Sequence, residues 1–163
     1  MGIRGRLIDF LETQGIPYRE RHHIPTYTAQ QEAGAQHLPG HRVAKVVIVM
    51  GDERPAMFVV PADRHVDLNA ARQFLRRGEV RLAREGELAR LFPDCEIGAM
   101  PPFGNWYGLQ VYLDDSLAAE PDLTFAAGRY DESITMPTAA LERFSHAVVA
   151  RIVEPAHRRL VAA

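Results

Sequence analysis

The sequence predicts an α+β fold: a compact single domain with a mixed, mostly antiparallel sheet flanked by helices. Two apolar runs, 43–50 and 56–61, are separated by the turn sequence GDERP, which is typical of a β-hairpin. Helix and strand patterns follow one another without regular βαβ units. The 163 residues are 47% hydrophobic and 25% charged, which suits one globular domain over 1–163.

Helices are expected where apolar residues recur every three or four positions. The first such run covers 4–14, and Gly15 ends it. Thr28 is a candidate N-cap for the second helix, because Gln31 follows three residues later in a capping-box pattern. Thr138 is a candidate cap for the last helix. The expected helices cover residues 4–14, 29–37, 67–75, 84–91 and 138–153.

Strands are expected where short apolar or alternating runs lie between turn residues. The sequence GRYD is the expected turn between the last two strands. Residues 94–108, DCEIGAMPPFGNWYG, hold three glycines and two prolines, which is typical of a loop. The expected strands cover residues 18–23, 43–50, 56–61, 80–83, 109–113, 122–128 and 132–137.

Composition narrows the class of protein. The net charge of −2 gives no overall attraction for polyanions, so any contact with nucleic acid must be local. Cys95 is the single cysteine, which rules out an internal disulfide and favours a reducing compartment. The first residues lack the apolar core of a signal peptide, and no apolar run is long enough to span a bilayer. We therefore expect a cytoplasmic protein with no membrane partner.

One basic residue is out of place. Lys45 is the single lysine among 19 basic residues, and it lies within the apolar run VAKVVIV, which is apolar on both faces. An ammonium group there is unfavourable unless it is paired or reaches water. One interpretation is that the side chain snorkels to the rim of the sheet. The other is that it projects into a pocket and donates to a carbonyl, a ribose hydroxyl or a phosphate, with burial lowering its pKa.

Two turns are candidate ligand contacts. In GAMPP, residues 98–102, glycine permits close approach of a ligand and the prolines fix the backbone, so N–H groups can be aimed at an oxyanion. In AAGRYD, residues 126–131, Tyr130 and Asp131 are polar groups next to a backbone edge. The alternative for both is an ordinary turn between two elements.

Metal and thiol chemistry have weak support. His22, His23, His37 and His41 are close in sequence, but Pro39 and Gly40 separate the last two, and there is no HExxH or paired CxxC. Cys95 has no histidine near it in sequence, so it is a weak candidate nucleophile. We expect no metal and no cofactor.

The order of several motifs resembles the YbaK/ProX family, the free-standing relatives of the editing domain of bacterial prolyl-tRNA synthetase. The motifs are HHIPTYTAQQEA, VAKVVIV, AMFVVPADRHVDL, GAMPP with its following FG, and FAAGRYDESITM. The resemblance covers about residues 5–145 and leaves 146–163 as a C-terminal extension. It implies a trans-editing aminoacyl-tRNA deacylase, a hydrolase that supports translation fidelity by cleaving the ester of a small amino acid mischarged on tRNA. The implied partners are the aminoacylated 3′ end of tRNA and an aminoacyl-tRNA synthetase.

The resemblance also assigns residues. Lys45 matches the family's essential lysine, and Gly98 and Pro102 match its GxxxP loop; these three are the catalytic candidates. The substrate-binding candidates, taken from the resemblance and from the two turns, are Thr26, Tyr27, Thr28, Ala99, Met100, Pro101, Gly128, Tyr130 and Asp131. Tyr130 is a departure, because many relatives carry a histidine or a small polar residue after the AAG turn.

Three alternatives stay open at this stage. In one, the chain is a non-catalytic module that binds aminoacyl-tRNA ends, a nucleotide or a synthetase partner. In another, it is a small-ester or metal-dependent hydrolase built on the histidines or Cys95. The basic stretch that runs from Arg72 to Arg84 is either an RNA contact or a solvated face balanced by nearby carboxylates.

Overall fold

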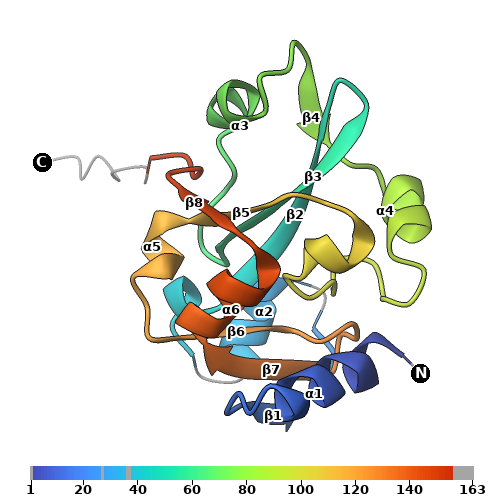
Figure 1. Cartoon of the computed structure of the whole chain (residues 1–163), viewed down its shortest axis with the longest axis vertical. Coiled ribbons are helices and arrows are strands. Elements are labelled where there is room, and N and C mark those ends of the chain that lie inside the picture. The colour runs from blue at the N-terminus through green and yellow to red at the C-terminus, as the bar shows by residue number, and fades with distance from the viewer. Residues whose placement is uncertain (1, 27, 36–37, 156–163) are drawn as a thin grey trace, which may run out of the picture.

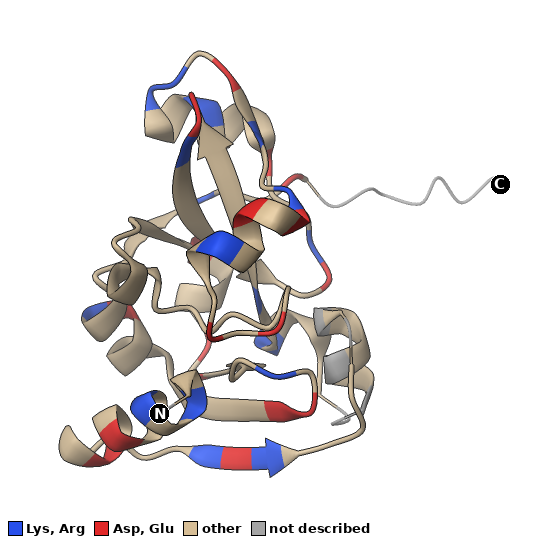
Figure 2. Cartoon of the chain, turned by 90° about the vertical axis from the view of Figure 1, so that its right-hand side faces the viewer, with Lys and Arg blue, Asp and Glu red and all other residues tan. Residues whose placement is uncertain are grey.

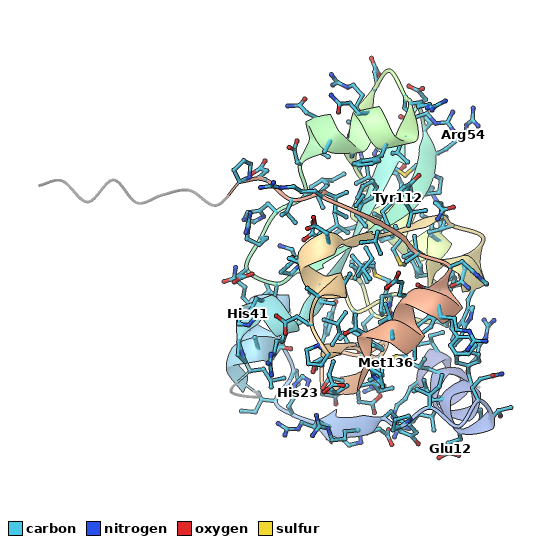
Figure 3. The ribbon with its side chains drawn as sticks, turned by 60° about the vertical axis from the view of Figure 1, so that its left-hand side comes forward. Glu12, His23, His41, Arg54, Tyr112 and Met136 are labelled. Atoms are coloured by element: carbon cyan, nitrogen blue, oxygen red, sulfur yellow. The ribbon has the colours of Figure 1, made fainter. Side chains whose placement is uncertain are left out.

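A long β-hairpin runs through the middle of the computed structural model, which describes residues 2–26, 28–35 and 38–155 (Figure 1). Its strands, β2 (Ala44–Gly51) and β3 (Arg54–Pro61), pair antiparallel along their whole length. Asp52 and Glu53 close the hairpin, both with positive φ, which is the backbone of a tight two-residue hairpin turn. Figure 3 shows Arg54, at this turn, at the opposite end of the molecule from Glu12 of the first helix.

The remaining elements surround this hairpin. In chain order they are α1 (Ile3–Thr13), β1 (Arg19–His22), α2 (Ala29–Ala35), the 3-10 turn η1 (Gly40–Arg42), β2, β3, α3 (Leu68–Leu75), β4 (Val80–Leu82), α4 (Glu85–Leu91), the 3-10 turn η2 (Gly104–Tyr107), β5 (Val111–Asp114), α5 (Asp115–Ala118), β6 (Asp122–Ala126), β7 (Glu132–Pro137), α6 (Thr138–Ser145) and β8 (Val148–Ala150).

The described strands form two sheets. The larger has the order β4-β2-β3-β5-β8 and is mixed, because β3–β5 and β5–β8 are parallel pairs. The smaller has the order β1-β7-β6 and is antiparallel. Val43, just before β2, forms an isolated bridge to Thr124 of β6, so the two sheets meet at the start of the hairpin. The expected α+β class and its mostly antiparallel pairing are confirmed, with the sheet divided in two.

The central strands of the larger sheet, β2 and β3, are largely buried on both faces. Ala44, Ile48 and Met50 of β2 pack into the main core, which also takes in α1 and the inner face of the smaller sheet. Val49 of β2, with Ala56 and Phe58 of β3, belongs to a second core that also takes in residues of α3 and β8. This two-sided burial explains why β2 reads as a continuous apolar run rather than as an alternating one.

The C-terminal helix is shorter than expected. α6 ends at Ser145, and His146 takes a left-handed conformation with φ of 55°. Residues 148–150 then form β8, which pairs parallel with β5. The expectation of a helix through 153 was therefore wrong. Pro137 occupies the N-cap of α6 and Thr138 is its first helical residue, so the expected Thr138 cap was wrong by one position.

The Thr28 cap is confirmed, because the Gln31 N–H donates to Thr28 Oγ1 at 3.1 Å at the start of α2. This helix ends at Ala35, and residues 36 and 37 of the expected span lie outside the described part of the chain. Within the described ranges, no helix is both long and apolar enough to cross a bilayer.

Candidate functional site

Four segments that are distant in sequence enclose one cavity of about 280 Å³. They are the segment after β1, the first half of β2, the loop between α4 and η2, and the end of β6 with the turn that follows it. The lining residues are Thr26, Thr28, Ala44, Lys45, Val46, Gly98, Ala99, Met100, Ala126 and Tyr130. Lys45 of β2 and Gly98 of the GAMPP loop are 53 positions apart in the sequence, but both line this cavity.

The cavity lies along an open edge of β2. On the β3 side the strand is fully paired, whereas β4 pairs only with residues Val49 to Gly51. The Ile48 carbonyl accepts the N–H of Ala83 on the β4 side, at 2.9 Å. Because backbone groups alternate along a strand, the N–H and C=O of Val46 point to this same side, beyond the end of β4. The cavity thus has a strand edge with hydrogen-bonding groups as one wall.

Lys45 is half-buried at this wall. Within the described residues no carboxylate oxygen lies within 4 Å of its ammonium group, and no hydrogen-bond acceptor contacts it. Burial lowers the pKa of Lys45, and the more distant Asp63 carboxylate opposes that shift. The ammonium is therefore available to a ligand, and it faces a cavity rather than a neighbouring charge.

The GAMPP loop presents two free backbone donors. Gly98 has φ of +86°, a conformation that glycine adopts without strain. The Ala99 N–H donates to the Glu96 carbonyl at 3.0 Å, and the Ala99 carbonyl accepts the Gly128 N–H at 2.8 Å. In the part of the chain that the structure describes, the N–H groups of Gly98 and Met100 have no acceptor. Both residues line the cavity, so two donors are left for a ligand oxygen.

Tyr130 ties three walls of the cavity together. Its hydroxyl donates to the Ile97 carbonyl at 2.6 Å, and its N–H donates to Glu96 Oε2 at 2.8 Å, which holds the GAMPP loop. Its carbonyl accepts the N–H of Thr26 at 2.8 Å and the Thr26 hydroxyl at 3.3 Å, which holds the segment after β1. Tyr130 is thus a structural part of the cavity rim.

The other candidate residues lie around the cavity rather than in its lining. Pro101 and Pro102, at the end of the GAMPP loop, are buried and are not among the lining residues. Gly128 packs against α1, and the Asp131 carboxylate accepts from Arg129 Nε at 3.3 Å. Tyr27 lies outside the described residues.

Sequence reasoning missed Ala44, Val46, Ala126 and Glu96. The first three are small or apolar residues that carry no chemical signal and enter the lining through their position on strand edges. Glu96 acts indirectly, because its side chain and carbonyl hold Tyr130 and Ala99. The one available hint was its place two residues before the GAMPP motif.

The described residues show no metal or thiol centre. No group of three His, Cys, Asp or Glu side chains in them is close enough to hold a metal ion. Figure 3 shows His23 and His41 apart, on separate segments, and His37 lies outside the described residues. Cys95 is not part of the cavity lining, and burial raises the pKa of its thiol to about 12, so the reactive thiolate is scarce at neutral pH.

Fold and cavity together define a small α+β domain in which one lysine and the backbone of a glycine-proline loop line a single cavity. A family model described as "Aminoacyl-tRNA editing domain" matches residues 23–144. The chain belongs to this family of aminoacyl-tRNA editing domains, as its resemblance to the YbaK/ProX family predicted. A search of curated proteins gave no significant match.

Solved structures share the whole fold. A proposed trans-editing enzyme for prolyl-tRNA synthetase is 27% identical, with a TM-score of 0.78, covering 93% of this chain and 97% of that one. A protein described as hypothetical is 22% identical, with a TM-score of 0.81 and coverage of 91% and 99%. A scaffold from computational epitope grafting is 24% identical, with a TM-score of 0.78 and coverage of 94% and 97%. The last two support the fold alone.

Proposed function

We propose that this protein is a trans-editing deacylase that hydrolyses the ester of a small amino acid mischarged on tRNA. The observation that carries the proposal is that Lys45 and the Gly98–Met100 backbone line one cavity. Membership of the editing family supplies the class of substrate. The cavity supplies the groups that such a reaction needs.

The reaction requires little from side chains. Water attacks the carbonyl carbon of the ester, the bond from that carbon to the ribose oxygen breaks, and the amino acid and a tRNA with a free hydroxyl leave. Negative charge develops on the carbonyl oxygen in the transition state, and preorganised N–H donors are the usual means of stabilising it. We assign this role to the Gly98 and Met100 N–H groups. The cavity positions the ester and a water molecule, and this positioning replaces a covalent nucleophile.

Lys45 acts in the proposal as a cation that anchors the substrate. A compact ammonium with three donors suits a phosphate or ribose oxygen of the terminal nucleotide. Because no carboxylate oxygen in the described residues lies within 4 Å of it, its charge is not paired before the substrate binds. Loss of the ammonium should therefore raise KM and lower kcat together, because it holds the ester in its reactive position.

Size exclusion explains the choice of a small amino acid. A cavity of about 280 Å³ lies at the low end of ligand pockets, and the terminal ribose and the aminoacyl group must share it. Tyr130 closes the rim and is itself held by hydrogen bonds, so it cannot move aside without breaking them. A bulky aminoacyl group is excluded by contact with these walls, which discriminates more sharply than the loss of one attractive contact.

The test is a panel of tRNAs mischarged with alanine, serine, threonine or cysteine. Wild type should release at least one of the small amino acids, and Lys45→Met should lose most of that activity while keeping the wild-type far-UV spectrum. Arg54→Met, at the hairpin tip, is the matched control and should keep full activity. Full activity of Lys45→Met would remove its proposed role. Tight binding of aminoacyl-tRNA by wild type with no release of any amino acid would favour the non-catalytic binding module instead.

A further inference from the structure

The outer face of the smaller sheet carries a row of arginines beside the cavity. In the register of this sheet, Arg21 of β1 stands opposite Ser133 of β7, and Ser133 stands opposite Ala126 of β6. Cross-strand partners share a face of a sheet, so Arg21 and Ala126 lie on the same face. Ala126 lines the cavity. Two strand spacings of ~4.8 Å put the Arg21 backbone about 10 Å from that of Ala126.

A second row runs next to the first. Arg19 stands opposite Thr135, and Thr135 opposite Thr124, on the same face. Arg19, Arg21, Thr124 and Thr135 line a small hollow together with Leu38, Arg42 and Asp122. Figure 2 shows the basic–acidic–basic order along β1, and alternation puts Glu20 on the opposite face from its two neighbours. The hollow and the cavity therefore lie on the same side of the smaller sheet.

The two β1 arginines are not neutralised by the protein. Among the described residues, no carboxylate oxygen lies within 4 Å of the guanidinium of Arg19 or Arg21. Other arginines do have such partners: Arg42 pairs with Glu120 at 3.2 Å, and Arg4 pairs with Glu20 on the other face of β1. Asp122 contributes one negative charge to the hollow, so the local balance remains positive.

We propose that Arg19 and Arg21 bind the sugar-phosphate backbone of the tRNA acceptor end while its terminal nucleotide occupies the cavity. The proposal rests on the proposed function. A guanidinium presents paired donors that match phosphate oxygens. The ~10 Å from Ala126 to Arg21 puts the arginine within a few nucleotides of the one that occupies the cavity. The face is polar and carries unpaired charge rather than an apolar patch, which favours RNA over a protein partner.

The basic stretch singled out in the sequence, from Arg72 to Arg84, is less suited to this contact. Figure 1 shows α3 and β4, which carry it, at the opposite end of the molecule from β1, β6 and β7. Arg81 is held between Glu53 at 2.9 Å and Glu87 at 2.7 Å, so its charge is already compensated. We interpret that stretch as a solvated face, in which Arg81 is paired with neighbouring carboxylates.

The test compares two double variants of equal charge. Arg19→Ala/Arg21→Ala should bind uncharged tRNA about tenfold more weakly than wild type in fluorescence anisotropy at low salt. The slope of log K against log salt should become less negative by about 2, because each lost phosphate contact removes about 1. Arg54→Ala/Arg72→Ala, at the far end, should keep the wild-type affinity and slope. Arg19→Lys/Arg21→Lys should restore the slope, because it restores the charge.

A second measurement separates this proposal from the first. The ratio of kcat/KM on aminoacyl-tRNA to kcat/KM on an aminoacyl-adenosine ester should fall at least fivefold in the β1 double variant. The arginine site would be overturned, even if the enzyme is an active deacylase, by either of two results. One is a wild-type salt slope in the β1 double variant, and the other is an equal loss of tRNA affinity in the far-end control. If the salt slope becomes less negative in the β1 double variant, but no form of the protein hydrolyses an ester, the arginine site is supported and the deacylase is rejected.

Discussion

Gly128→Ala tests whether this glycine is a substrate contact or a packing requirement. Gly128 has φ of +93°, and a Cβ added there would lie 2.2 Å from Cγ2 of Ile3, on the first turn of α1. Carbon atoms normally pack at ~3.5–4.0 Å, so the helix or the turn must move by roughly 1.5 Å. Ile3 is 3% exposed, which leaves it little room to give way.

The expected cost has two parts. Alanine in a left-handed conformation costs about 1–2 kcal/mol, and overpacking a filled site costs about 1–3 kcal/mol. Gly128→Ala should therefore reduce the free energy of unfolding by about 2–5 kcal/mol. Gly98→Ala is the matched control: its φ is +86°, but no atom lies within 4 Å of the added Cβ. That variant should show only the conformational part, about 1–2 kcal/mol.

A double-mutant cycle isolates the clash. Ile3→Ala removes Cγ2, and the nearest remaining atom, Ile3 Cβ, is 3.7 Å away, an ordinary contact. In that background Gly128→Ala should cost only about 1–2 kcal/mol, a coupling of about 1–3 kcal/mol. The assay is urea unfolding followed by the fluorescence of the single tryptophan. An equal cost of Gly128→Ala in both backgrounds would refute the packing explanation.

Four further predictions follow from the site and its surroundings. Because burial lowers the pKa of Lys45, its charge reduces the free energy of unfolding at neutral pH, and Lys45→Met should be more stable than wild type in urea. This advantage should shrink as the pH rises toward the usual lysine pKa of 10.5, where the unfolded chain also loses the charge. An advantage that grows with pH contradicts this. Tyr130→Phe removes the hydrogen bond to the Ile97 carbonyl and should cost about 0.5–1.5 kcal/mol, whereas a neutral effect on the urea midpoint would argue against the bracing role. Cys95, with its thiol pKa raised to about 12, should react with iodoacetamide at pH 8 far more slowly than free cysteine does, and rapid modification that abolishes activity would revive thiol catalysis. Asp114 accepts a hydrogen bond from the buried Ile152 N–H at 3.0 Å, so Asp114→Ala should lower the free energy of unfolding by about 1–3 kcal/mol. Calorimetry can measure this loss, and a wild-type Tm would exclude it.

The elements predicted well are those whose signal is local. The hairpin of β2 and β3 follows from two apolar runs and a short turn, and the Thr28 cap follows from a spacing of three residues. β8 was missed because its partner, β5, lies more than thirty residues earlier, and a parallel pairing leaves no turn signature between them. The sequence there is short and follows a good helix, so periodicity alone extended the helix past His146.

The candidate site follows the same division. Lys45 and the GAMPP loop carry chemical signals of their own, a cation in an apolar strand and a glycine beside two prolines. Their meeting in one cavity depends on the tertiary fold. The arginines of β1 were overlooked because only the strand register shows that Arg21 lies on the same face of the sheet as Ala126. The basic stretch around Arg81 attracted notice through its density, although Arg81 itself is paired with Glu53 and Glu87.

The bridge between Val43 and Thr124 places the cavity at a seam between two sheets. One wall, the edge of β2, belongs to the larger sheet, and another, Ala126 at the end of β6, belongs to the smaller. A ligand that contacts both walls adds a second connection between the two sheets. Binding should therefore slow amide hydrogen exchange along β6 and the first residues of β2 more than in the distant β4. Transient separation of the two sheets at this boundary would then set how readily a substrate enters and how quickly its products leave.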